Sequence, residues 1–162
     1  MSQDIFSLWN NSYNLKDTSL TIKGYSRAGE RSCFQIPAIS LMFDAGVRTV
    51  NTPNHIFITH CHSDHIFDLP IILSGINNKK TNIFTPVNVE IVNNFIESSM
   101  LLINNGKNKK IPEYQINKVK PEQIINFSEN KRDYQVEIFK CYHTVPAVGF
   151  GLAEVKKKLK KE

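Results

Sequence analysis

The sequence has few cysteines and no long apolar run. Its three cysteines, Cys33, Cys61 and Cys141, are odd in number and show no Cys-x-x-Cys spacing. This argues against a disulfide framework or a cysteine-rich zinc finger, so we interpret them as reduced thiols. No stretch approaches the roughly 18 consecutive apolar residues that a membrane-spanning helix needs. The amino-terminal MSQDIFSLWN lacks the basic and apolar regions of a secretory signal. We therefore expect a cytoplasmic or nuclear protein that is not secreted and has no membrane partner.

Internal repeats and low-complexity linkers are also absent, which predicts a single domain over residues 1–162. The hydrophobic content of 41% and the charged content of 22% are typical of an ordinary globular protein. The net charge of +5 is modest, and part of it lies in a basic tail, residues 156–162. That tail is either a solvated end or a patch that contacts phosphates.

The order of predicted elements is strands first, then strands mixed with helices. Helices are predicted over 66–75 and 87–103, where Val89, Val92, Phe95, Ile96 and Ile103 repeat at helical spacing and predict core packing. Strands are predicted over 19–26, 32–37, 39–46, 55–59, 81–86, 114–120, 124–128 and 133–143, with a turn at 24–29. We expect the last three strands to form a meander. This mixture indicates an α/β or α+β fold.

The densest group of metal-ligand side chains is His-x-His-Ser-Asp-His, residues 60–65. His60 and His62 continue a predicted strand, and its period of two points both imidazoles to the same side. Asp64 and His65 follow where the chain turns into a helix, so they can point toward the same space. Imidazole and carboxylate ligands suit zinc, which keeps a position open for water in catalytic sites. The alternative is a solvated polar loop.

Three motifs together resemble the metallo-β-lactamase superfamily, and in particular its tRNase Z (ribonuclease Z) branch. THCHSDHIFDLP, residues 59–70, looks like the tRNase Z form of the histidine motif. LMFDAG, residues 41–46, is similar to an earlier motif in which a strand ends in Asp-x-Gly. CYHTVPAVGFGLAE, residues 141–154, is similar to a third motif with a ligand histidine. The resemblance covers most of residues 20–155 in the right order.

The resemblance implies a metallo-β-lactamase αββα sandwich, of which this chain would hold the first half plus the start of the second. It implies a zinc-dependent phosphodiesterase that removes the 3′ trailer from precursor tRNA by a metal-bound hydroxide. One Zn²⁺ would be held by His60, His62 and His143, and a second would start from Asp64 and His65. Asp64 would also assist proton transfer as a catalytic residue.

The resemblance further implies that Asp44 accepts a hydrogen bond that fixes the orientation of a ligand. Plainer interpretations remain open, because Asp44 can serve a turn and His143 can be an ordinary core histidine. The predicted turn with Arg27 and Arg31 lies where tRNase Z has a loop near the tRNA end, but a basic turn explains it equally well.

The sequence departs from the family pattern after the third motif. A complete member needs a further Asp that bridges the metals and a further His, and residues 144–162 contain neither. Two zinc ions are expected in a complete site and one is plausible in this chain. We therefore expect a homo-oligomer or a partner chain that supplies the rest of the fold, with precursor tRNA as the RNA partner. Asp68 stands where the branch usually has Gly.

Two alternative functions stay open. One is a non-catalytic remnant or subunit that binds RNA or a partner chain. The other is a superfamily hydrolase that acts on a thioester, a lactone or a cyclic nucleotide, because a fold does not fix a substrate.

Overall fold

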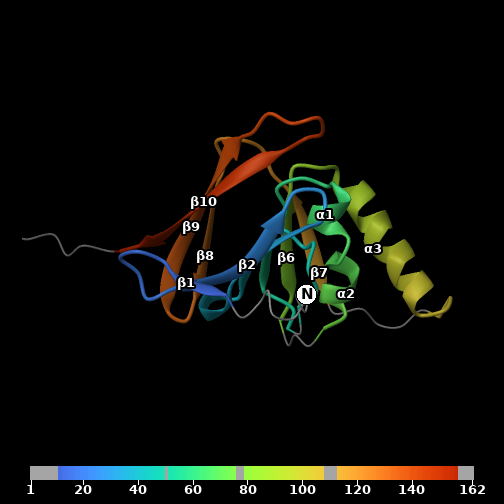
Figure 1. The fold of residues 1–162 in the computed structure, drawn as a ribbon, viewed down its shortest axis with the longest axis horizontal. Coiled ribbons are helices and arrows are strands. Elements are labelled where there is room, and N and C mark those ends of the chain that lie inside the picture. The colour runs from blue at the N-terminus through green and yellow to red at the C-terminus, as the bar shows by residue number, and fades with distance from the viewer. Residues whose placement is uncertain (1–10, 50, 76–78, 108–112, 157–162) are drawn as a thin grey trace, which may run out of the picture.

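The computed structural model describes residues 11–49, 51–75, 79–107 and 113–156, which form two β-sheets and a set of helices (Figure 1). Most of the predicted basic tail, residues 157–162, lies outside the described residues. The described helices are the 3₁₀ helix η2 (Pro37–Ile39) and the α-helices α1 (Ser63–Ile66), α2 (Leu69–Leu73) and α3 (Val89–Ile103). None of them is long and apolar enough to cross a membrane.

The larger sheet has seven strands that pair in their order along the chain. They are β1 (Ser12–Asn14), β2 (Thr21–Arg27), β3 (Arg31–Ile36), β4 (Leu41–Phe43), β5 (His55–Phe57), β6 (Thr81–Thr85) and β7 (Tyr114–Lys118). Strands β1 to β4 pair antiparallel, whereas β4 to β7 pair parallel. Helix α3 is the crossover that a parallel pairing of β6 and β7 requires.

The smaller sheet is antiparallel and has the order β10-β9-β8. Its strands are β8 (Ile124–Glu129), β9 (Arg132–Lys140) and β10 (Val148–Val155). It lies on one side of the larger sheet, and the α-helices lie on the other side (Figure 1). The described residues thus form a helix layer, a sheet layer and a second sheet layer.

The central strands of the larger sheet bury side chains on both faces because successive residues point to opposite sides. Met42 and Ile83 pack into the core under the helices, and Phe57 and Phe84 pack into the core between the sheets. The rings of Phe57 and Phe84 stack with centroids 4.5 Å apart. Two apolar cores therefore hold β4, β5 and β6 from both sides.

Asn88 caps helix α3 at its start, because its side chain accepts a hydrogen bond from the backbone N–H of Glu90. Its buried residues are Val92, Ile96 and Met100. The predicted stripe is right at its centre and wrong at its ends, because Val89 and Ile103 are exposed. Val89 and Ile103 are the first and last residues of the helix, and Met100, which the predicted stripe left out, is buried.

The expected meander is wrong for its first strand. β7 does not pair with β8; it pairs with β6 and completes the edge of the larger sheet. Only β8 and β9 of the three predicted strands pair with each other, and β10 joins them. The chain passes from the larger to the smaller sheet after β7. The prediction missed this passage because the periodicity of a sequence does not indicate which sheet a strand joins.

Several predicted boundaries also move. The expected turn begins later, because β2 runs through Gly24 to Arg27 and a Cβ on Gly24 would meet the side chain of Phe34 in the neighbouring strand. The predicted strand 39–46 is shortened by η2 and ends at Phe43, and the predicted strand 133–143 ends at Lys140.

The predicted helix 66–75 is two short helices. They are α1 and α2, and Pro70 lies in the first turn of α2, where a missing N–H costs nothing.

Candidate metal centre

The predicted site residues gather at the carboxyl ends of the parallel strands. Asp44 follows β4 directly, and residues 59–65 follow β5, so the parallel pairing of β4 and β5 brings them to the same edge. Ligand sites of open α/β sheets lie at this edge. His143 comes from the segment between β9 and β10, which is attached here because the Val148 N–H donates to the Thr59 carbonyl over 3.0 Å.

Three histidines from these two segments converge. One ligand nitrogen from each of His60, His62 and His143 lies within 4.8 Å of the other two. The ring of His60 meets the rings of His62 and His143 edge-on, with centroids 4.9 and 4.6 Å away. Three imidazoles with their nitrogens turned inward are a typical zinc ligand set.

The reason that His60 and His62 share one side differs from the prediction. Strand β5 ends at Phe57, two residues earlier than expected, and both histidines lie in the irregular segment before α1. The two side chains therefore converge because the chain turns into α1 here. The alternating direction of side chains along a strand does not explain their convergence.

Burial lowers the pKa of His60 to about 4, and the neighbouring charge of His65 adds to this shift. His60 is consequently neutral at physiological pH and keeps a lone pair for a metal. Its Nδ1 lies 3.0 Å from the Thr59 hydroxyl, which leaves Nε2 for a ligand.

The spacing of the other two nitrogens fits a shared cation. His62 Nδ1 and His143 Nε2 lie 3.1 Å apart. Two nitrogens at tetrahedral zinc, each with a bond of 2.0–2.1 Å, lie about 3.3 Å apart. The spacing of this pair is thus compatible with zinc, and the His60 nitrogen lies within 4.8 Å of both.

The carboxylate of Asp44 organises the deeper part of the site. It is buried, and its Oδ1 accepts hydrogen bonds from the Thr59 backbone N–H at 2.7 Å and the Thr59 hydroxyl at 2.9 Å. Its Oδ2 lies 2.8 Å from His65 Nδ1, and this hydrogen bond raises the pKa of His65. A proton held on Nδ1 leaves the Nε2 lone pair of His65 free, as metal-binding histidines require.

Asp64 contacts the ring nitrogen of His65 that Asp44 does not contact. Its Oδ2 is 3.3 Å from His65 Nε2 and accepts a hydrogen bond from the Gly29 backbone N–H at 3.1 Å. The structure therefore places Asp64 and His65 side by side, with ligand atoms at a spacing that one cation can bridge. The rings of His60 and His65 lie 4.0 Å apart, so this pair adjoins the three-histidine group.

A glycine lets α1 approach the end of β4. The Ala45 N–H donates to the His65 carbonyl at 2.7 Å, and the Asp68 N–H donates to the Ala45 carbonyl at 2.9 Å. A Cβ on Gly46 would overlap the Asp64 carbonyl oxygen. The Asp-Ala-Gly sequence thus provides both the buried carboxylate and the space for the histidine motif.

The turn between β2 and β3 supports the site but is not a free basic patch. Arg27 pairs with Glu30 at 3.2 Å, and Arg31 donates to Asp68 at 2.8 Å and to the Gly46 carbonyl at 3.2 Å. Asp68 thus faces Arg31. The contacts show that acidic side chains neutralise both arginines and that the Gly29 backbone N–H supports Asp64.

The sequence prediction missed Thr59 and Gly29. Thr59 contacts Asp44, His60 and His65 through its hydroxyl, and it precedes the first histidine directly, which is the signal that could have singled it out. Gly29 contacts the site from thirty-five residues earlier in the chain, and no local pattern indicates that contact.

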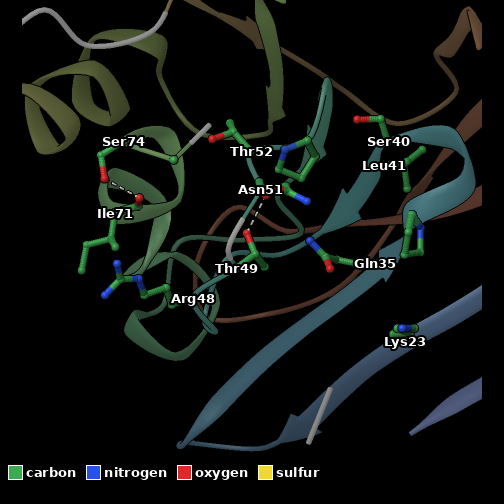
Figure 2. A pocket seen from close by; sticks show the side chains of 13 residues that line it. Lys23, Gln35, Ser40, Leu41, Arg48, Thr49, Asn51, Thr52, Ile71 and Ser74 are labelled. Atoms are coloured by element: carbon green, nitrogen blue, oxygen red, sulfur yellow. Dashed lines mark hydrogen bonds between the residues drawn. The ribbon is translucent and has the colours of Figure 1, made fainter. Parts of the chain in front are cut away.

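A separate cavity lies away from the histidines. It has a volume of about 870 Å³ and is lined near the amino ends of β4 and β5 by residues that include Leu41 and Pro53. Figure 2 shows Lys23 and Arg48 on different sides of it. The described residues that line it include no histidine, cysteine or carboxylate, so they offer no metal ligands and do not compete with the histidine cluster as the candidate site.

The layered helix and sheet arrangement, with histidines at the carboxyl edge of the parallel strands, is the metallo-β-lactamase fold. A crystal structure of human tRNase Z, short form, aligns with a TM-score of 0.51 at 20% identity, over 84% of this chain and 57% of that one. This confirms the predicted fold class, including its partial extent. No family model matches the sequence.

The chain belongs to the ribonuclease Z family. It is 30% identical to nuclear ribonuclease Z of Triticum aestivum over 147 residues, which cover 87% of this chain and 79% of the wheat protein. It is 28% identical to the chloroplastic tRNase Z TRZ2 of Arabidopsis thaliana over 89% of this chain and 40% of that protein. Ribonuclease Z of Methanococcus maripaludis strain C6 is 32% identical over 64% of this chain and 33% of its own length. The predicted family is confirmed, and the chain spans less than half of two of these three relatives.

Proposed function

We propose that this chain forms the histidine-bearing part of a zinc-dependent phosphodiesterase that removes the 3′ trailer from precursor tRNA. The observation that supports this most is the convergence of His60, His62 and His143 from two separated segments. Its relatives are named ribonuclease Z and tRNase Z, which favours RNA as the substrate.

In this proposal His60, His62 and His143 hold one zinc ion, and Asp64 and His65 contribute to a second. Bound there, zinc supplies Lewis-acid stabilisation of a transferring phosphoryl group and activates water for attack. The protein contributes a preset orientation for two of its ligands, because Nδ1 of His60 contacts the Thr59 hydroxyl and Nδ1 of His65 contacts the Asp44 carboxylate.

Asp44 keeps the proton of His65 on Nδ1, and its two hydrogen bonds from Thr59 hold the carboxylate in place for that task. Asp64 is the proposed proton-transfer residue, since its carboxylate lies at the ligand nitrogen of His65 and is anchored by the Gly29 N–H. A carboxylate so placed can hold a proton beside the scissile phosphate.

The second zinc needs more ligands than Asp64 and His65. We propose that a second copy or a partner chain completes it, together with the sheet edges that soluble proteins normally cover. On the outer face of the three-stranded sheet, Ile124, Phe139 and Val155 are exposed, which is consistent with a surface that another segment covers.

The test combines metal analysis with a generic phosphodiesterase assay. Zinc per chain and hydrolysis of bis(p-nitrophenyl) phosphate are measured for the wild type, for His62→Ala and for His55→Gln, a histidine at the other end of β5. We expect zinc binding and metal-dependent hydrolysis in the wild type and the control, and loss of both in His62→Ala. Hydrolysis that survives His62→Ala, or zinc that stays bound to it at full stoichiometry, contradicts the proposal.

A second candidate is a non-catalytic subunit that keeps one zinc. It is favoured by one observation: in the described part of the chain, the three histidines are the one group of three ligands close enough to share an ion. This candidate predicts one zinc per chain and no hydrolysis in any assembly. Cleavage of a precursor tRNA with a 3′ trailer, abolished by a chelator, would exclude it.

A further inference from the structure

A groove of about 570 Å³ opens beside His143, where the ends of the two sheets meet. Its walls come from the end of β7 and from the segment that joins β9 to β10. On β9 the inward-facing residues Val136 and Ile138 belong to the core between the sheets, and Lys140 continues that side beyond the core. The groove is therefore the open end of the space between the sheets.

Lysines dominate the charge of this groove. Lys118, Lys120 and Lys140 line it and are exposed, and the part of its lining that the structure describes includes no Asp or Glu. Among the described residues none of the three forms an ion pair, whereas Arg27 and Arg31 near the other side of the site are both paired with acids. These lysines are therefore not paired with an acid in the described part of the chain, and an anionic partner suits them.

An exposed aromatic side chain lies beside the lysines. Tyr142 lines the groove, directly precedes His143 and is 88% exposed. The ammonium group of Lys140 lies 4.7 Å from the centre of its ring. A ring so exposed and so close to positive charge matches the stacking platforms on which proteins hold unpaired bases beside a basic groove.

We propose that this groove binds single-stranded RNA next to the scissile phosphate, with Lys118, Lys120 and Lys140 neutralising backbone phosphates and Tyr142 stacking on a base. The proposal rests on the function proposed above, because it takes the histidine cluster as the point where the RNA is cut. Single strand is favoured over duplex because a duplex hides the base faces that Tyr142 would contact.

The lysines are tested by binding of a fluorescent ten-nucleotide oligouridine to the full chain in EDTA, which prevents metal-dependent cleavage. The variant Lys118→Gln, Lys120→Gln, Lys140→Gln is compared with Lys16→Gln, Lys107→Gln, Lys156→Gln, which removes the same charge from exposed positions outside the groove. Each phosphate contact on a single strand contributes about −0.7 to the slope of log K against log salt. We expect the groove variant to make this slope shallower by about 2 and the control variant to leave it unchanged. Equal slopes in the two variants overturn the proposal.

Tyr142 is tested in the same assay. Tyr142→Ala is expected to weaken binding of the single strand on the order of tenfold, while Tyr142→Phe keeps it. Against an RNA duplex of the same length, Tyr142→Ala is expected to have little effect. An equal loss for single strand and duplex, or no loss for either, contradicts the stacking role.

The two proposals can fail separately. If the groove variants lose RNA binding but the wild type shows no metal-dependent hydrolysis, the RNA groove stands and the enzymatic function fails. If the wild type cleaves RNA and the groove variants bind and cleave it equally well, the groove proposal alone fails. A change in oligomeric state in the groove variants, with unchanged RNA binding, would assign the surface to a protein partner and also overturn it. Thermal unfolding of each variant, expected to match the wild type because these side chains are exposed, checks the fold.

Discussion

The two segments that form the candidate metal centre are held very differently. Residues 59–65 are fixed by the buried Asp44 carboxylate, by the Thr59 hydroxyl and by backbone hydrogen bonds between α1 and the end of β4. Residues 141–147 are mostly exposed and are tied to the first segment through the Val148 N–H. The first segment is preorganised by folding, and the second brings one more imidazole and the surface that we propose for RNA. A mutation in the first should therefore affect stability and metal binding together, and a mutation in the second should affect metal binding alone.

The largest effect is expected for Gly46→Ala. The added Cβ overlaps the Asp64 carbonyl oxygen, which belongs to the backbone and cannot move without shifting α1. We expect a loss of about 1–3 kcal/mol in the free energy of unfolding, with weakened metal binding. Urea unfolding and zinc titration measure both.

Gly149→Ala in β10 is the matched control for Gly46→Ala. Its Cβ would lie 3.2 Å from Cys141 Sγ, a side-chain atom that can give way, so a much smaller cost is expected. Equal costs at the two glycines would show that the close approach of α1 to β4 does not matter.

Asp44→Asn is expected to come next. The amide cannot accept the hydrogen bonds of both Thr59 and His65 as the carboxylate does, so the His65 ring loses its fixed tautomer. Loss of such an outer partner typically costs 10–100-fold in metal affinity. Competition with a zinc chelator measures the affinity, and a melting curve should show lower stability as well. Unchanged affinity would mean that Asp44 serves only its turn.

His143→Ala tests the exposed segment. Because this side chain is exposed, its removal should change the free energy of unfolding by no more than about 0.5 kcal/mol in the absence of metal. Zinc binding at the three-histidine group should nevertheless be lost. A destabilised apo protein, or an unchanged zinc content, would remove the distinction between the two segments.

The smallest effect concerns His55, which lies at the end of β5 away from the metal centre. Burial lowers its pKa, its Nδ1 has no hydrogen-bond partner among the described residues, and its ring packs on Phe127. The unfolded chain therefore takes up a proton at a higher pH than the folded one, so this contribution to stability is present above pH 6.5 and is lost as pH falls through the lowered pKa. The unfolding free energy of His55→Gln at pH 7.5 and 5.5 should differ less than that of the wild type. Equal differences would contradict this.

Sequence patterns predicted what depends on local spacing and on motif order. They predicted the helix over Val92 and Ile96, the strands from β2 to β9 in outline, and the family and fold. The roles of the candidate ligands stay predictions, although the structure brings His60, His62 and His143 together.

The incorrect predictions concern contacts between residues far apart in the sequence. Strand β7 joined the larger sheet because α3 returns the chain parallel to β6. The Gly29 contact with Asp64 spans thirty-five residues of chain, and a hydrogen bond of that range leaves no trace in local periodicity. The same holds for Asp68, which precedes α2 and whose partner Arg31 lies thirty-seven residues earlier, in β3.

The most direct test of the metal centre is a crystal structure of the protein soaked in zinc, with anomalous data recorded at the zinc edge. The account predicts an anomalous peak about 2.0–2.1 Å from one nitrogen each of His60, His62 and His143. No peak there at full zinc loading, or a peak held by other residues while these three rings turn apart, would contradict it.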